Sequence, residues 1–142
     1  MTLTVVRDTR EQKEYHFEGV ETIDRKLDVG DYSVEGYEDQ FAVERKSLND
    51  LTQSLGVDRE RFEREIKRGQ ALDELAVVVE SNPREVQQWD YYSDIHPNSI
   101  LGTCRKWPSK YETLEFQWAG NRMHGKRHTL EFLTEWTKQY QD

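Results

Sequence analysis

The stretch VGDYSVEGYEDQFAVERKSLND, residues 29–50, holds the strongest structural signals in the chain. Its two short runs of apolar and aromatic residues, 32–34 and 41–43, are separated by a polar segment with a glycine, a pattern typical of two antiparallel strands. The second run ends in Glu44, Arg45 and Lys46. Ser47 then offers a helix cap, with Asp50 three residues on. The stretch therefore predicts a hairpin whose second strand leads directly into a helix.

The segments on either side of this stretch predict an α/β fold. Before it, short runs at 2–8 and 21–27 join the hairpin as a meander of short strands. After it, an amphipathic helix begins near Asp58 and ends near Gly69 or continues past it. The run LAVVVE at 75–80, apolar as far as Val79, is typical of a strand covered on both faces. Pro83 and Pro97 can open helices, residues 113–118 alternate as a strand does, and a final helix follows Asn121. We expect a mixed central β-sheet flanked by α-helices on both sides.

The last predicted helix carries an apolar stripe. Its members recur at helical spacing and comprise Leu130, Leu133, Trp136 and Tyr140. Such a stripe packs either on the core of the same chain or on a second subunit, and the pattern leaves both readings open. A homodimer and a monomer are both compatible with it.

Length and composition limit the class of protein. A chain of 142 residues fits one domain, and its single cysteine, Cys104, excludes an intrachain disulfide and a thiolate metal cluster. The sequence has no apolar run long enough to cross a membrane and no basic-then-apolar leader. We expect a soluble, intracellular protein without a membrane partner, either cytoplasmic or associated with the nucleoid.

The net charge of −8 argues against indiscriminate nucleic-acid binding, which needs positive potential. Most of the acidic excess, however, lies in residues 1–58. Locally basic segments occur at 59–68, 105–110 and 121–128. They either form a surface that faces phosphates or are scattered solvated faces, and charge alone does not decide between the two.

The charged end of the second strand has a specific chemical meaning. In a strand, Glu44 and Lys46 point to one face and Arg45 to the other. A hairpin returns Glu44 close to Asp31, so that two carboxylates converge, which is costly unless a cation lies between them. Mg²⁺ prefers such oxygen ligands, and an adjacent lysine can orient water or stabilise charge, so the set suits phosphodiester hydrolysis.

Two alternatives remain at this level. Asp31 could be an ordinary turn residue, with Glu44 and Lys46 forming a surface ion pair that contributes little. The two carboxylates could also serve a glycosidase. The lysine between them and the lack of an aromatic-rich sugar groove near the motif disfavour that second reading.

Taken together, Gly30-Asp31, Glu44-Arg45-Lys46 and Asp50 form the pattern GD…ERKxxxD, which resembles the signature of the XPF family of structure-specific DNA endonucleases. The segment VVRDTREQ, residues 5–12, resembles the family's opening strand and its Asp-x-Arg-Glu element. The resemblance is dense to about residue 70 and looser afterwards. It implies a restriction-endonuclease-like core and cutting of branched, flap or fork DNA with Mg²⁺ or Mn²⁺.

The resemblance also implies a role for each motif residue. Asp31 and Glu44 would be metal ligands, with the Arg45 carbonyl as a third, and Lys46 would act on the attacking water or on the developing charge. Asp8 would line the same pocket and belong to the metal site, as a ligand through water or as an acceptor just behind the ligands; its alternative is a turn or capping aspartate.

The remaining motif residues are expected to support this chemistry. Arg45 would bind Asp50 or the following loop and hold the strand edge in shape. Glu11 would lie just behind the metal ligands, and Arg10 would contact phosphate or neutralise the acidic pocket. Arg59 and Arg61, on the helix after the motif, are the further candidates for DNA binding.

The resemblance finally bears on domain organisation and partners. We expect residues 1–142 to form a single XPF-type nuclease domain, without the helix-hairpin-helix or helicase domains of longer members. A helicase or another DNA-targeting protein could then supply part of the choice of DNA, and a homodimer would follow the family. The alternative function is a catalytically idle XPF-like module that binds DNA or pairs with an active nuclease.

Overall fold

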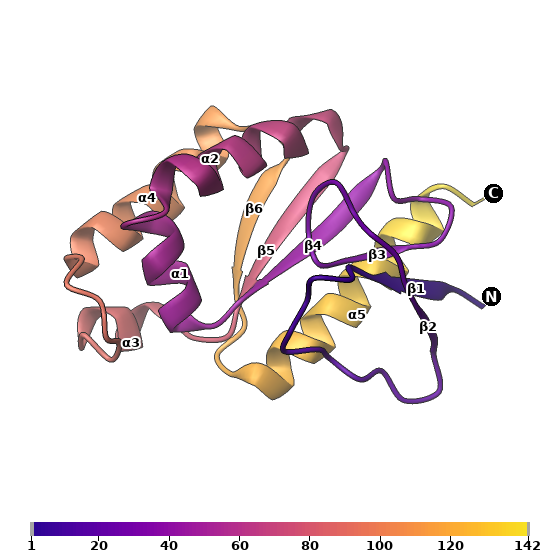
Figure 1. Cartoon of the computed structure of the whole chain (residues 1–142), viewed down its shortest axis with the longest axis horizontal. Coiled ribbons are helices and arrows are strands. Elements are labelled where there is room, and N and C mark those ends of the chain that lie inside the picture. Colours follow the sequence, from indigo (N-terminus) through magenta and orange to yellow (C-terminus); the bar gives the residue numbers. More distant parts are fainter. Residues whose placement is uncertain (1, 142) are drawn as a thin grey trace.

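The computed structural model describes residues 2–141 and shows one six-stranded mixed sheet with helices on both faces (Figure 1). The strands are β1 (Thr4–Arg7), β2 (Glu21–Asp24), β3 (Tyr32–Val34), β4 (Phe41–Lys46), β5 (Glu74–Val79) and β6 (Leu114–Trp118). The helices are α1 (Leu48–Leu55), α2 (Arg59–Arg68), the 3-10 helix η1 (Gly69–Ala71), α3 (Pro83–Gln87), α4 (Pro97–Lys110) and α5 (Arg122–Gln139). The predicted α/β architecture is therefore confirmed.

The strands lie in the order β2-β1-β3-β4-β5-β6. The predicted hairpin is present, because β3 pairs antiparallel with β4 and Tyr32 lies opposite Val43. β4, β5 and β6 run parallel. The expected meander is wrong at β2, which pairs parallel with β1. The long connection between these strands returns the chain to the same direction, and an ion pair between Arg7 Nε and Asp24 Oδ1 at 2.8 Å joins their ends.

Each face of the sheet has its own hydrophobic core. On one face, Ala42 of β4 and alternate residues of β5 pack with α1, α2 and α4. On the other, Phe41 and Val43 of β4 pack with Phe132 and Leu133 of α5. The run of valines in β5 is fully buried because both of its faces are covered, as its composition predicted.

The start of α1 follows the sequence signal closely. The Ser47 side chain accepts a hydrogen bond from the Asp50 N–H at 3.1 Å, and Asp50 in turn accepts from the Ser47 N–H. This capping box satisfies two backbone donors at the point where β4 ends. It fixes the direction in which the chain leaves the strand.

The stripe of the last helix contacts the core of the same chain. Leu133 is fully buried, and Leu130 and Trp136 pack against the core formed with α5. Tyr140 lies just after α5 and stays partly exposed. The stripe thus contributes to the fold, which leaves the homodimer a prediction. Within residues 2–141, no helix is both long and apolar enough to cross a membrane.

Candidate active site

Asp31 connects three strands at the centre of the site. Its N–H donates to the Val43 carbonyl at 2.7 Å, and its own carbonyl accepts from the Asp8 N–H at 2.8 Å. Its carboxylate Oδ2 accepts from the Arg45 N–H at 2.8 Å, continuing the pairing of β3 with β4 through a side chain. The position of this carboxylate is therefore set by the sheet.

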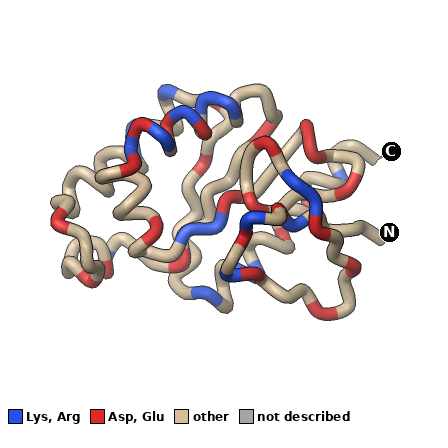
Figure 2. The backbone as a smooth tube through the Cα atoms, viewed as in Figure 1, with Lys and Arg blue, Asp and Glu red and all other residues tan. Residues whose placement is uncertain are grey.

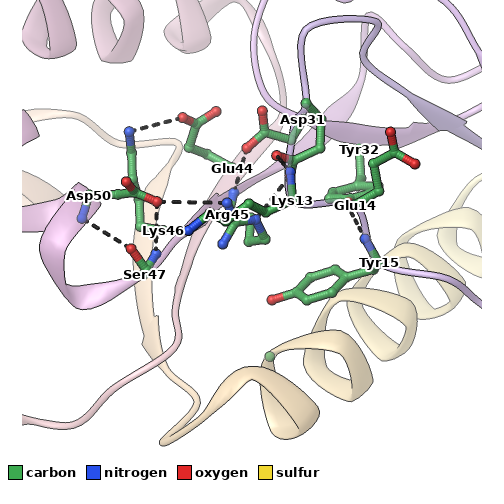
Figure 3. A network of polar contacts seen from close by, with 12 residues as sticks. Lys13, Glu14, Tyr15, Asp31, Tyr32, Glu44, Arg45, Lys46, Ser47 and Asp50 are labelled. Carbon is green, nitrogen blue, oxygen red and sulfur yellow. Dashed lines mark hydrogen bonds and ion pairs between the residues drawn. The ribbon is translucent and has the colours of Figure 1, made fainter.

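Glu44 and Lys46 lie on the face of β4 that α1 and α2 cover, while Arg45 points to the opposite face (Figure 3). Lys46 Nζ lies 3.3 Å from Glu44 Oε2 and donates to Ser54 Oγ at 2.8 Å. It also lies 4.8 Å from the centre of the Phe62 ring. These contacts hold the ammonium group beside the Glu44 carboxylate, on the face that strand geometry predicted for both.

A cavity of about 330 Å³ lies between α2, the segment that leads into β3, and the end of β4. Its lining is polar and of mixed charge. The acidic residues that line it are Asp8, Asp28, Asp31, Glu44, Asp58 and Glu65, and the basic ones are Arg10, Lys46, Arg61, Arg64 and Arg68. The fold thus brings Asp31, Glu44 and Lys46 into one cavity.

The surroundings of the two central carboxyl groups disfavour their charged forms and raise the pKa of both. Burial, and after it the negative charge of Glu11, raise the pKa of Asp31 to about 7. Burial and the nearby Asp31 likewise raise the pKa of Glu44. For Lys46, burial acts to lower the pKa, but the surrounding carboxylates, Glu44 first, raise it overall. Lys46 is therefore a cation, and the carboxylates lack enough positive charge to offset their repulsion.

Arg45 supports the site from behind the sheet. Its Nε lies 3.0 Å from Glu11 Oε2 and its Nη1 lies 3.0 Å from Glu80 Oε1, whereas Asp50, the partner that the sequence predicted, is 3.7 Å from Nη2. All three atoms belong to the guanidinium group, which is almost completely buried. Asp50 therefore acts mainly through the helix cap, and Glu11 and Glu80 bind Arg45 more closely.

Comparison with known proteins identifies the family and a protein of the same fold. A family model, the ERCC4 domain, matches residues 7–132. The chain belongs to the ERCC4 domain family. Among solved structures, XPF from Aeropyrum pernix superimposes with a TM-score of 0.70 at 19% sequence identity, which shows a shared fold. A search of curated proteins found no match.

The superposition covers 98% of this chain and 62% of the Aeropyrum protein, so the chain spans less than two thirds of that relative's length. The resemblance that the motif GD…ERKxxxD suggested is confirmed at the level of family and fold. The chain therefore contains an XPF-type domain of a nuclease family.

Two carboxylates of this ERCC4 domain suit a hard divalent cation. Among residues 2–141, no group donates a hydrogen bond to Asp31 Oδ1 or Glu44 Oε1 or forms an ion pair with either atom, and the two carboxylates repel each other. Within residues 2–141, no three His, Cys, Asp or Glu side chains form a complete metal site. Mg²⁺ is commonly held by one or two carboxylates, with water and substrate phosphate completing its shell. The donor set fits that pattern.

Asp8 lines the same cavity, but its oxygens have other partners. It accepts from Arg10 Nε at 2.9 Å and from the Leu27 N–H at 2.8 Å. Burial acts to raise its pKa, but the hydrogen bonds from Arg10 and Leu27 lower it overall. This geometry favours an indirect role through water, and direct metal binding by Asp8 stays a prediction.

The arginines of α2 differ in where they point. Arg61 lines the cavity, as do Arg64 and Arg68, which recur on the same helix face three and seven residues later. Basic and acidic residues alternate along this helix (Figure 2). Arg59 lies elsewhere: its guanidinium sits 5.0 Å from the Trp107 ring, and Nη1 donates to the Leu55 carbonyl at 3.1 Å. A role of Arg59 in DNA binding stays a prediction.

Sequence reasoning missed Glu65 as a site residue, and within the basic segment 59–68 it preferred Arg59 and Arg61 to Arg64 and Arg68. Each lies on α2, and its approach to β4 depends on the turn between α1 and α2 rather than on any local motif. The helix periodicity contained a partial signal, since Phe62 and Ile66 define the buried face and the residues flanking that face border the cavity.

Proposed function

We propose that this protein is a divalent-metal-dependent DNA endonuclease that hydrolyses phosphodiester bonds at branched, flap or fork DNA. The observation that carries the proposal is that two mutually repelling carboxylates, the half-buried Asp31 and the buried Glu44, lie in one cavity with the cationic Lys46. The family match to the ERCC4 domain supports the nuclease class.

In this mechanism Asp31 and Glu44 would hold Mg²⁺ or Mn²⁺. When bound, the ion supplies Lewis-acid polarisation of the phosphoryl oxygen and a water of lowered pKa. Lys46 remains protonated, because Glu44 and the other carboxylates raise its pKa. Its ammonium group therefore donates hydrogen bonds and stabilises negative charge that develops on the phosphate, rather than accepting a proton from water.

The surroundings of the carboxylates suit a nucleic-acid backbone. Arg61, Arg64 and Arg68 lie within eight residues of α2, and the seven steps from the first to the last cover about 10 Å of helix, or about three nucleotide steps along a duplex. The preference for branched DNA rests on the family likeness. In this proposal residues 1–142 act as one nuclease domain, and a second copy or a DNA-targeting partner such as a helicase contributes to the choice of junction.

The proposal is tested with end-labelled flap, fork, duplex and single-stranded DNA, each incubated with the purified protein. We expect cleavage with Mg²⁺ or Mn²⁺, none with chelator, and faster cleavage of the flap or fork than of the plain duplex. Binding of these DNAs without cleavage in any metal would instead support the idle binding module.

Metal binding should stabilise the protein more at high pH than at low pH. Because burial raises the pKa of Asp31 from 3.8 to about 7, the metal-free folded protein binds more protons than the unfolded chain in that interval. Its stability therefore falls as the pH rises through the interval, and a bound divalent ion takes the place of those protons. We expect saturating Mn²⁺ to raise Tm by about 5 °C near pH 8 and by less than about 2 °C near pH 5.

Differential scanning fluorimetry at constant ionic strength measures this difference, and Asp31→Asn is the control. Asparagine keeps the acceptor for the Arg45 N–H but removes the charge. The variant should show almost no Mn²⁺ effect at either pH. An equal shift at both pH values in the parent protein would contradict the assignment of these carboxylates.

The cavity-facing arginines should determine DNA affinity. Replacing both Arg64 and Arg68 with glutamine removes two phosphate contacts, so we expect KM for DNA to rise about tenfold and the slope of log affinity against log salt to fall by about two. Lys67→Gln is the matched control, because Lys67 lies on the same helix but does not line the cavity. An effect of Lys67→Gln on log KM and on the salt slope that is half as large as that of the double change would show that α2 contributes only general charge, because Lys67→Gln removes one charge and the double change two.

A further inference from the structure

A buried ionic cluster lies directly behind the proposed site, on the α5 face of the sheet. Its centre is Arg45, whose side chain is 5% exposed and lies between the carboxylates of Glu11 and Glu80, which are 5% and 8% exposed. Burying three charges costs desolvation energy that their attraction only partly offsets, and removing one member leaves an uncompensated charge. Such a cluster contributes little net stability. Its main effect is to fix the positions of the groups that it binds.

Besides Arg45, groups from two other parts of the chain hold Glu80 in place. Tyr15 Oη donates to Glu80 Oε2 at 2.6 Å, and Arg122 Nη1, from the first turn of α5, lies 3.5 Å from the same oxygen. The Arg122 guanidinium also lies 4.9 Å from the Tyr15 ring. Burial, followed by Glu80, raises the pKa of Tyr15, so its hydroxyl remains a donor.

The packing around Glu80 allows little movement. A Cβ at Gly125 of α5 would lie 2.5 Å from Tyr15 Oη and 3.2 Å from Glu80 Cγ, so the helix approaches as closely as a glycine permits. The Glu80 N–H donates to the Lys46 carbonyl at 2.8 Å. Glu80 therefore contacts the end of β4 twice, through its backbone at Lys46 and through its carboxylate at Arg45.

The cluster acts on the opposite face of the sheet through the backbone of β4. The Arg45 side chain is bound behind the sheet, while its N–H donates to Asp31 Oδ2 at 2.8 Å. Glu44 and Lys46, its chain neighbours, project into the cavity. Any displacement of Arg45 therefore changes both the donor that orients Asp31 and the separation of Asp31 from Glu44.

We propose that Glu80 is a positioning residue for the two-carboxylate site: by binding Arg45, it fixes the backbone that orients Asp31 and Glu44. It does not touch substrate. The effect on cleavage rests on the proposed function, but the mechanical coupling across the sheet can be measured without DNA.

The test is the variant Glu80→Gln, measured in three ways. Amide hydrogen exchange followed by NMR should show the Arg45 N–H exchanging at least about tenfold faster, because Arg45 has lost one of its two close ionic partners. Mn²⁺ affinity by calorimetry and kcat for flap cleavage should each fall about 10–100-fold, the usual effect of losing a group that orients a metal ligand. KM for DNA should not change, because Glu80 does not line the cavity of the site.

Glu63→Gln is the matched control. Glu63 also accepts from a tyrosine hydroxyl, that of Tyr111, and pairs with Lys110 Nζ at 3.0 Å, but it has no contact with Arg45. Glu63→Gln should leave the Arg45 exchange rate, the Mn²⁺ affinity and kcat unchanged. If Glu80→Gln does not fold, Tyr15→Phe replaces it: this change removes only the donor to Glu80 and should shift the same measurements in the same direction by a smaller factor.

The proposal is overturned if a folded Glu80→Gln or Tyr15→Phe protein retains both the Arg45 exchange rate and the Mn²⁺ affinity of the parent. A rise in KM with kcat unchanged would also overturn it, because that result places Glu80 at the DNA surface. If the parent protein cleaves no DNA, the proposed function fails. The Arg45 exchange rate still tests whether Glu80 fixes the backbone at Arg45.

Discussion

Replacing Asp31 by asparagine should lower the rate of DNA cleavage about a thousandfold or more while the fold is retained. One of the two carboxylates that would hold the metal is then neutral, and a factor of a thousand corresponds to about 4 kcal/mol of lost transition-state stabilisation. Single-turnover cleavage of a labelled flap in saturating Mg²⁺ measures the effect. The pairing of β3 with β4 survives, because the asparagine oxygen can still accept from the Arg45 N–H.

The same change should not destabilise the metal-free protein. Burial and the neighbouring carboxylates raise the pKa of Asp31 to about 7, so its charge opposes folding above that pH. We expect the Tm of metal-free Asp31→Asn near pH 8 to equal or exceed that of the parent, a trade of stability for activity common in enzyme sites. An Asp31→Asn protein that is less stable than the parent and still cuts DNA would contradict both the expected stability and the expected loss of cleavage.

Asp39→Asn is the matched control for this experiment. Asp39 is an exposed aspartate between β3 and β4 and does not line the cavity. The same loss of one negative charge there should leave the cleavage rate within about twofold of the parent, because an exposed charge at this position is screened by solvent. A large loss of activity in this variant would show that total charge, rather than the site, governs the rate.

Replacing Gly30 by alanine should lower the free energy of unfolding by about 2–5 kcal/mol, the sum of backbone strain and overpacking. Gly30 has a φ of +86°, and a Cβ there would lie 2.9 Å from Ala42 Cβ and 3.1 Å from the Val43 carbonyl oxygen. Those neighbours belong to β4, next to Asp31 and Glu44. We therefore expect cleavage to be lost even under conditions where the variant remains folded.

Gly36→Ala separates the effect of backbone strain from that of overpacking. Gly36 has a similar φ of +93°, but a Cβ there would meet no atom within 4 Å. The backbone strain alone should cost about 1–2 kcal/mol, with cleavage unchanged. Urea unfolding monitored by tryptophan fluorescence gives the free energy of unfolding of both variants. Equal losses of stability in the two variants would show that contact with β4 is unimportant.

Local sequence patterns were sufficient to predict much of the fold and the core of the site. Ser47 and Asp50 marked the start of α1, and the apolar run that ends at Val79 marked a strand buried on both faces. Alternation along β4 placed Glu44 and Lys46 on one face, and the hairpin brought Asp31 to them. These features depend on residues close in sequence, or on a single turn.

The features that sequence patterns did not predict depend on long-range packing. The parallel pairing of β2 with β1 follows the path of a long loop, which has no periodic signal. Glu80 reaches Arg45 only because β5 lies beside β4, and Glu65 reaches the cavity only because α2 folds back over the sheet. No spacing within the chain indicates either contact.

Asp31 and Glu44 are proposed to bind a divalent cation together. Crystals of the protein soaked in Mn²⁺, with data collected near the manganese absorption edge, test it directly. We expect one strong anomalous peak at about 2.2 Å from a carboxylate oxygen of each residue, and no such peak in Asp31→Asn crystals. A fully occupied manganese site elsewhere, with none between Asp31 and Glu44, would contradict it.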